Sequence, residues 1–189
     1  MTRDQLIARF NLKQLVWQDN CLNNGQSLRP SAVLIPLVER NGTVNVLLTK
    51  RSANLRHHPN QISFPGGKYE QTDQSLRMTA IRETNEELGI AIEKIAIFGQ
   101  LPSHQTITGF HVTPYIGFID QDYQAIVDPG EVAELFEIPL NQLLTNSDHF
   151  SLMIYRKKVM HQVYFKPTSG KAIWGITAAI LEQLKRLLH

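Results

Sequence analysis

The dipeptide Asn41-Gly42 separates two apolar, β-branched runs and constrains the fold more than any other feature of this chain. The runs cover residues 31–39 (SAVLIPLVE) and 43–49 (TVNVLLT). Asn and Gly adopt positive φ angles readily, and both central residues of a two-residue type I′ turn require them. The sequence therefore predicts an antiparallel β-hairpin over residues 31–49.

Short apolar runs follow one another through the rest of the chain. We expect further strands over residues 94–99, 110–119, 132–138, 150–155 and 159–165. The segment 51–67, which holds two prolines and two glycines, is expected to form a loop. Strands outnumber helices, and the helices are interspersed among them. This order predicts a mixed sheet covered by helices, in the α/β or α+β class.

Three helices are expected around this sheet. A capping box over residues 2–5 opens a short helix that continues through Phe10. A second helix runs from about Gln74 to Leu88, with Thr72 or Asp73 as its N-cap and Gly89 at the left-handed position that ends it. The last helix is amphipathic, and its buried face is expected to hold Trp174, Thr177, Ile180, Leu181, Leu184 and Leu188.

Composition narrows the class of protein. The chain has 189 residues, 42% of them hydrophobic, without repeats or linker-like stretches, which predicts a single domain over residues 1–189. A net charge of +2 gives no basis for nucleic-acid or membrane binding. Cys21 is the only cysteine, so no internal disulfide or thiolate zinc site forms and a reducing compartment is expected. With no secretory signal and no long apolar stretch, we expect a cytoplasmic protein, and the sequence indicates no particular oligomeric state.

An acidic cluster near the end of the second helix is the main candidate for chemistry. Glu83, Glu86 and Glu87 are three and four positions apart, so their carboxylates share one face of the helix. Repulsion between them and with the negative end of the helix dipole costs about 1 kcal/mol. Mg²⁺ prefers carboxylate oxygens and offsets that cost, so the cluster indicates a metal site. Alone, the motif fits equally well with a solvated acidic surface that Arg82 neutralises.

A glycine loop before the helix makes the combination more specific. Phe64-Pro-Gly-Gly67 leads toward the helix, and its glycines permit backbone angles and close approaches that other residues forbid. On its own, such a segment is most often a plain turn. Together with the acidic helix, it predicts a loop that brings backbone groups to bound metal ions.

The segment from Phe64 to Ile90 resembles the Nudix box, Gly-x5-Glu-x7-Arg-Glu-U-x-Glu-Glu-x-Gly-U, where U is aliphatic. The identical positions are Gly67, Arg82, Glu83, Glu86, Glu87, Gly89 and Ile90. The chain departs from the pattern in three ways. The interval before Arg82 is one residue longer, Asp73 stands at the first acidic position, and Thr84 stands at the first aliphatic one.

The longer interval and the aspartate are similar to one branch of this family, the coenzyme A diphosphatases. That branch has the signature Leu-Leu-Thr-x-Arg-Ser-x3-Arg-x3-Gly-x3-Phe-Pro-Gly-Gly, which residues 47–67 match in spacing. Asn60 replaces the first glycine, and Asn is the next-best residue for a positive φ. The segments 108–117, 131–140 and 174–178 also resemble this branch.

The resemblance implies a fold, a reaction and a cofactor. The fold is a Nudix-like mixed β-sheet sandwiched between helices. The reaction is Mg²⁺-dependent hydrolysis of coenzyme A or a derivative, which gives 4′-phosphopantetheine and adenosine 3′,5′-bisphosphate, and Mn²⁺ is a substitute metal. Glu83, Glu86 and Glu87 would bind the metal, and Arg82 would hold a box glutamate in place by a charge-assisted hydrogen bond. The alternatives are a Nudix hydrolase of NADH or ADP-ribose, and a Nudix domain that binds a nucleotide without cutting it.

Several further residues are candidates around the same site. Arg51, Arg56, Gly66 and Gly67 are expected to bind the substrate, and His57 and His58 are basic residues of the same loop. The general base is a box glutamate or one of Glu131 and Glu134, which are also candidate metal ligands. His104 and His111 are expected to be hydrogen-bonded residues outside the metal site, since Mg²⁺ prefers oxygen ligands.

Overall fold

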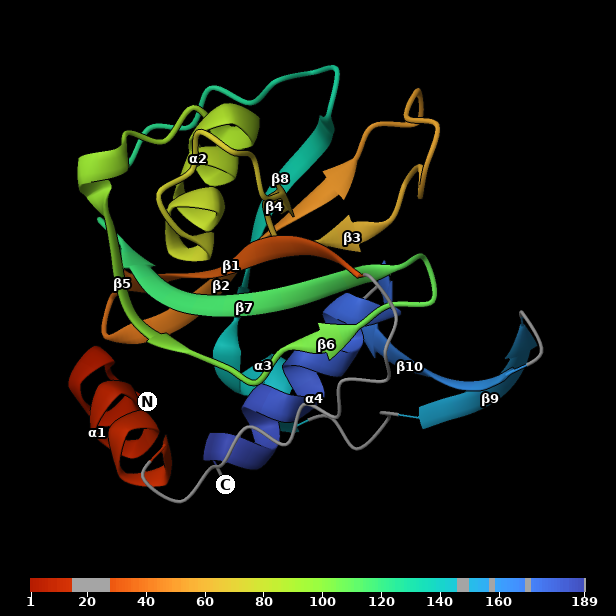
Figure 1. The fold of residues 1–189 in the computed structure, drawn as a ribbon. Coiled ribbons are helices and arrows are strands. Elements are labelled where there is room, and N and C mark those ends of the chain that lie inside the picture. The colour runs from red at the N-terminus through yellow and green to blue at the C-terminus, as the bar shows by residue number, and fades with distance from the viewer. Residues whose placement is uncertain (15–27, 146–149, 157–158, 169–170, 189) are drawn as a thin grey trace.

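The computed structural model describes residues 1–14, 28–145, 150–156, 159–168 and 171–188 (Figure 1). Its elements are α1 (Arg3–Gln14), β1 (Arg29–Arg40), β2 (Thr43–Arg51), β3 (Ile62–Ser63), β4 (Gly66–Lys68), α2 (Leu76–Leu88), the 3₁₀ helix η1 (Ile92–Lys94), β5 (Ile95–Gln100), β6 (His104–Gln105), β7 (Phe110–Ile119), β8 (Val132–Pro139), α3 (Leu140–Thr145), β9 (Phe150–Arg156), β10 (Val159–Thr168), β11 (Lys171–Trp174) and α4 (Ile176–Leu188). Cys21 lies outside the described residues.

An eight-stranded mixed sheet forms the centre of the molecule. Its main path runs β3-β2-β1-β7-β5, while β4 pairs with β1, β6 with β7 and β8 with β2. Strands β1 and β7 are parallel, and the other pairs are antiparallel. Helix α2 lies on one side of this sheet, and α1, α3 and α4 lie on the other (Figure 1). The predicted class, a mixed sheet sandwiched between helices, is therefore confirmed.

The predicted hairpin is the junction of β1 and β2. Arg40 pairs with Thr43, and the two residues between them have positive φ angles, 51° at Asn41 and 74° at Gly42. These angles are the ones that a type I′ turn requires, so the local sequence fixes the register of the two central strands. Both strands extend beyond the predicted ranges, to 29–40 and 43–51.

Alternate residues of the central strands point into two separate cores. In β1, Ile35 faces the core shared with α1, α3 and α4, whereas Leu34 faces the core beneath α2. In β2, Leu48 and Leu47 divide in the same way, and all four side chains are fully buried. Each such side chain contributes about 1.5–3 kcal/mol relative to exposure. Both faces of the sheet therefore bury apolar side chains. For this reason β1 and β2 are apolar along their length and do not alternate strictly between apolar and polar residues.

The first and last helices follow the sequence prediction closely. The capping box forms, because the Gln5 N–H donates to the Thr2 hydroxyl (3.4 Å) and the Thr2 N–H donates to the Gln5 side chain (3.2 Å). Helix α1 then continues to residue 14, four residues beyond Phe10. Helix α4 buries five of the six residues predicted for its apolar face: Thr177, Ile180, Leu181, Leu184 and Leu188. None of the helices within the described ranges is long and apolar enough to cross a membrane.

Two expectations about the elements are wrong. The segment 51–67 is not a continuous loop, because β3 and the first residues of β4 lie within it. Strand β4 forms through backbone pairing with β1 (Val33 with Gly66), a partner more than thirty residues away that local sequence does not reveal. Trp174 is not on the buried face of α4. It ends strand β11, where it pairs with Phe165 and remains 37% exposed.

Candidate active site

Helix α2 carries the acidic cluster and is fixed at both ends by local capping. Ser75 is the N-cap, and its hydroxyl accepts a hydrogen bond from the Met78 N–H (3.3 Å). At the other end, Gly89 has a left-handed φ of 64°, and its N–H donates to the Asn85 carbonyl (2.7 Å). The C-terminal glycine was predicted correctly, but the helix begins at Leu76 and neither predicted N-cap residue caps it.

Asp73 does not cap the helix because its carboxylate is already occupied. Its two oxygens accept from the Arg82 guanidinium at 2.9 and 3.0 Å, and one also accepts from the Thr79 hydroxyl at 2.8 Å. The Glu70 N–H donates to the same carboxylate at 3.0 Å. These hydrogen bonds, foremost those of Arg82, hold the pKa of Asp73 well below its usual range. Asp73 is therefore ionised, and it holds the Arg82 side chain in place through charge-assisted hydrogen bonds.

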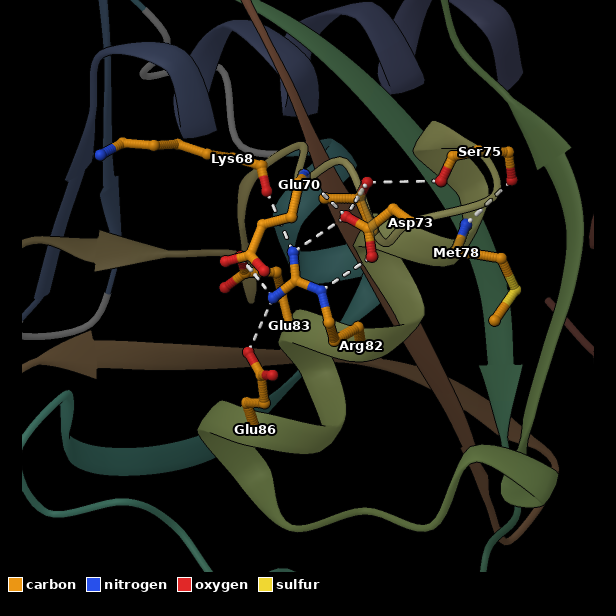
Figure 2. A network of polar contacts seen from close by, with 9 residues as sticks. Lys68, Glu70, Asp73, Ser75, Met78, Arg82, Glu83 and Glu86 are labelled. Atoms are coloured by element: carbon orange, nitrogen blue, oxygen red, sulfur yellow. Dashed lines mark hydrogen bonds and ion pairs between the residues drawn. The ribbon is translucent and has the colours of Figure 1, made fainter.

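Arg82 lies at the centre of this polar network (Figure 2). Beyond its paired bonds to Asp73, it donates to the Lys68 carbonyl at 3.0 Å. Its Nη1 contacts Glu86 at 2.8 Å and Glu83 at 3.1 Å. Hydrogen bonding to Asp73 is the largest of the effects that raise the pKa of Arg82. One guanidinium thus connects the strand β4, the loop before α2 and two of the cluster's carboxylates.

Glu87 is the buried member of the cluster, with 4% of its surface exposed. Burial raises the pKa of Glu87 from its ordinary value of 4.5 to about 8. The charge of Arg51 and a hydrogen bond from the Gly66 backbone act in the opposite direction, and the charges of Glu131 and Glu83 add to the increase. The positive charge of Arg51 therefore compensates only in part for the burial of this carboxylate.

Glu83 is tightly enclosed by the glycine loop. A Cβ atom added to Gly67 would overlap with the Glu83 carboxylate, so any other residue there would require that side chain to move. Gly66 has a φ of 152°, and a Cβ there would overlap with the Ala32 backbone of β1. Burial, the largest effect, raises the pKa of Glu83, and the charges of Glu86 and Glu131 act in the same direction while Arg82 lowers it. Both glycines are therefore explained by close packing.

Glu86 differs from the other two glutamates. Its side chain is 57% exposed and turned toward Arg82, as Figure 2 shows. Arg82 contacts both Glu83 and Glu86, and the charges of Glu87 and Glu131 also interact with Glu83 or with each other. Within this group, Glu86 lies at the solvent-exposed edge.

The two later acidic candidates lie in different surroundings. The negative charge of Glu131 acts on both Glu83 and Glu87, so it borders the cluster. Its carbonyl accepts from the Ser52 N–H (2.8 Å), which fixes the start of β8 against the end of β2. Glu134 instead forms an ion pair with Lys171 at 2.6 Å. The structure separates two residues that the sequence left equivalent.

The donor set of this site suits a hard divalent cation. Among the described residues, no group of three His, Cys, Asp or Glu side chains is arranged to hold a metal ion. The carboxylates of Glu86 and Glu83 instead form ion pairs with Arg82. Nevertheless, Glu83, Glu87 and Glu131 repel one another electrostatically, and burial raises the pKa of the first two. Carboxylate oxygens crowded in this way favour Mg²⁺, which needs few protein ligands and retains several waters.

The loop after β2 brings further candidate residues to the edge of the cluster. Arg51 ends β2, and its charge acts on Glu87. Arg56 is exposed within the loop. Asn60 has a φ of 61°, which agrees with the positive φ expected for a residue that replaces glycine. His104 lies elsewhere, bonded to Gln183 at 2.9 Å, with a pKa lowered by burial.

Two parts of the network were not identified from the sequence. Thr79 supports Asp73 from the first turn of α2, and the Lys68 carbonyl supports Arg82 from β4. A hydroxyl six residues after a carboxylate is no recognisable motif. The backbone carbonyl becomes available only when β4 pairs with β1, so no local signal identifies it.

Comparisons with known proteins identify relatives of the whole chain. Residues 28–161 match the NUDIX domain family. The chain is 40% identical over 184 residues to the uncharacterized Nudix hydrolase NudL of Enterobacter sp. (strain 638), covering 97% of this chain and 93% of the relative. It is 42% identical over 156 residues to the protein of the same name from Pectobacterium atrosepticum, covering 82% and 81%.

Solved structures share the fold at low sequence identity. A MutT/nudix family protein from Enterococcus faecalis aligns with a TM-score of 0.55 at 17% identity, covering 100% of this chain and 75% of that one. The Nudix hydrolase RenU from M. Smegmatis aligns with a TM-score of 0.52 at 21% identity, covering 60% and 72%. At such identities these structures show the fold alone.

Proposed function

The chain belongs to the Nudix hydrolase family, whose members hydrolyse phosphoric anhydrides, and on that premise we propose that its substrate is coenzyme A or a derivative. The observation that supports this choice is the position of the signature segment 47–67. Arg51, Gly66 and Gly67 all belong to it, and all three adjoin Glu83 or Glu87. The segment that resembles the coenzyme A branch is thus the one that frames the acidic cluster.

Metal binding is assigned to the carboxylates of α2. Glu83 and Glu87 are the inner ligands, because both are enclosed and burial raises the pKa of each. Glu86 completes the set by exchanging its contact with Arg82 for the metal, which its exposure permits. Bound Mg²⁺, or Mn²⁺ in its place, offsets the charge of the diphosphate and lowers the pKa of bound water. Arg82, fixed by Asp73, keeps the helix and the glycine loop in register around these ligands.

Phosphate recognition is assigned to the loop that follows β2. Arg51 has a fixed backbone, since its N–H donates to the Gln61 carbonyl at 2.9 Å, and its charge reaches the cluster. Arg56 is exposed on the same loop. A guanidinium presents donors in a planar fork that suits phosphate oxygens, so both arginines are suited to the anionic substrate.

Glu131 is the better candidate for the general base. It borders Glu83 and Glu87, whereas Glu134 is held by Lys171 at 2.6 and 2.7 Å. Both carboxylate oxygens of Glu134 are already engaged by the Lys171 ammonium. Glu131→Gln should therefore lower kcat by about a hundredfold, and Glu134→Gln by less than about threefold.

A substrate panel tests the proposed function. Coenzyme A, NADH and ADP-ribose are incubated with the enzyme and Mg²⁺, and the products are identified by mass. We expect the highest kcat/KM for coenzyme A, with release of 4′-phosphopantetheine and adenosine 3′,5′-bisphosphate. A higher kcat/KM for NADH or ADP-ribose would show that another nucleoside diphosphate derivative is the substrate. Binding of all three without hydrolysis would show a nucleotide-binding domain without catalysis.

A further inference from the structure

We propose that the indole of Trp174 is the platform on which the adenine ring of the substrate stacks. This inference deepens the proposed function, because it requires a substrate that contains an adenine nucleotide. It does not require coenzyme A in particular, since NADH and ADP-ribose contain the same base.

Strand pairing and a tight turn hold the backbone of Trp174 in place. It ends β11 opposite Phe165, and Gly175, with a φ of 69°, turns the chain into α4 directly afterwards. The Gly175 N–H donates to the Tyr164 carbonyl at 2.8 Å, which closes this corner. The neighbouring Ile173 is fully buried, whereas Trp174 is 37% exposed. A rigidly held tryptophan with an open surface is a common feature of binding sites.

A short series of contacts connects Trp174 to the acidic cluster. The Gln61 side-chain amide donates to the Trp174 carbonyl at 3.3 Å, and Gln61 itself is buried. The Gln61 carbonyl accepts from the Arg51 N–H at 2.9 Å. Arg51 in turn acts electrostatically on Glu87. The backbone of Trp174 and the carboxylates are therefore linked through Gln61 and Arg51, while the indole itself contacts His58 of the same loop.

The loop beside Trp174 adds the groups that a nucleotide needs. The imidazole of His58 lies 6.1 Å from the indole, centroid to centroid, with the planes tilted by 53°. His58 has a left-handed φ of 55°, a backbone conformation that is uncommon for residues other than glycine and clusters at functional sites. Arg56 is exposed two residues earlier. An aromatic surface next to basic groups fits a base joined to phosphates.

The aromatic surface favours the adenosine end of the substrate over the pantetheine end. An indole stacks well on a flat heterocycle, whereas pantetheine is a flexible chain of amides and methylenes without a ring. Among the other exposed aromatic residues, Tyr155 lies on β9, at the far edge of the three-stranded sheet from β11. It provides a matched control for loss of an exposed ring.

Steady-state kinetics of three variants test the platform. With whichever adenine-containing substrate the wild-type enzyme hydrolyses, Trp174→Ala should raise KM about tenfold and change kcat less than about twofold. Trp174→Phe should recover most of that loss, because a smaller ring still stacks. Tyr155→Ala should retain the wild-type KM. An unchanged KM in Trp174→Ala, or a KM increase of equal size in Tyr155→Ala, would overturn the proposal, and thermal melting of each variant checks that it is folded.

Fluorescence identifies which end of the substrate contacts the indole. Trp17 is the only other tryptophan, so Trp17→Phe leaves Trp174 as the single reporter. Adenosine 3′,5′-bisphosphate should quench its emission, and 4′-phosphopantetheine should not. Quenching by 4′-phosphopantetheine alone, or by neither product, would overturn the proposal. If the enzyme prefers NADH or ADP-ribose and quenching by adenosine 5′-monophosphate persists, the stacking site stands although the coenzyme A assignment fails.

Discussion

Helices α2 and α4 are each thirteen residues long and cover opposite faces of the same sheet, yet they bury different kinds of side chains. The buried residues of α4 are Thr177, Ala178, Ile180, Leu181, Leu184, Leu187 and Leu188. Those of α2 are Thr79, Ala80, Ile81, Thr84, Glu87 and Leu88. Burial of aliphatic side chains stabilises α4. In α2, hydroxyl groups and a carboxylate are buried as well, and burying these polar groups costs free energy. The difference agrees with a packing role for α4 and with the metal-binding role proposed for α2.

The charged residues in the last turn also distinguish α4, which has favourable charges there, from α2, which does not. Helix α4 has Lys185 and Arg186 in its last turn, where cations interact favourably with the helix dipole. Helix α2 has no basic residue in its last turn and carries Glu86 and Glu87 there instead. Arg82 offsets only part of this arrangement from one turn earlier. A helix selected for stability alone would resemble α4.

The largest effect is expected for Glu87→Gln in α2. Loss of a metal-binding carboxylate should lower kcat/KM by about a thousandfold. The metal-free protein should be at least as stable as the wild type at neutral pH, because a neutral amide replaces a buried acid. Assays with Mg²⁺ and thermal melting in a chelator measure the two properties. The matched control is Glu182→Gln in α4, which should retain activity, and equal activity in both variants would refute the assignment of chemistry to α2.

Removing packing from α4 should have the opposite character. Leu184→Ala deletes a fully buried side chain and should lower the free energy of unfolding by about 3 kcal/mol. The proposed metal ligands lie on the other face of the sheet, so kcat of the folded protein should stay within about twofold. Urea unfolding and kinetics at saturating substrate test this separation. A loss of kcat as large as the one in Glu87→Gln would mean that the two helices do not divide their roles.

A smaller and more specific effect concerns pH. The pKa of Glu87 is raised to about 8, so the native protein holds a proton there that the unfolded chain loses near its ordinary value of 4.5. Stability of the metal-free protein should therefore fall as the pH rises through that interval. Mg²⁺ binds the ionised form, so the increase in Tm that it causes should be larger at about pH 8 than at about pH 6. Melting curves at both values test this contrast, and Glu87→Gln, which lacks this titrating group, should show a smaller dependence on pH. An increase in Tm that is equal at both values in the wild type would contradict the prediction.

Local signals in the sequence predicted the elements whose cause is local. The turn at Asn41 and Gly42, the capping box at Thr2 and the C-terminal glycine at Gly89 all formed as expected. The aliphatic spacing of α4 was equally informative, because a period of 3.6 residues indicates which side faces the core. The mixed sheet between helices followed from the order of these elements.

Elements and contacts that depend on distant partners were not predicted. Strand β4 contains two glycines and forms only because β1 accepts it. Asp73 was expected to cap α2, but Arg82 binds its carboxylate and Ser75 caps instead. Trp174 fits the helical period by chance, while backbone pairing places it in β11.

The candidate site shows the same division. The spacing of the box predicted that Glu83, Glu86 and Glu87 share one face of the helix. It does not reveal how deeply each is buried, and Glu87 is enclosed whereas Glu86 is exposed. It also left Glu131 and Glu134 equivalent. Their difference depends on Lys171, a residue of another strand, and therefore becomes visible only in the folded chain.

Binding of Mn²⁺ to the protein without substrate tests the central claim most directly. Titrations followed by electron paramagnetic resonance report free Mn²⁺ for the wild type, Glu83→Gln, Glu87→Gln and the control Glu182→Gln. The account predicts that wild type and control bind with similar affinity and that each α2 variant binds at least about tenfold more weakly. Equal affinity in all four proteins would show that the enclosed carboxylates of α2 do not hold the metal.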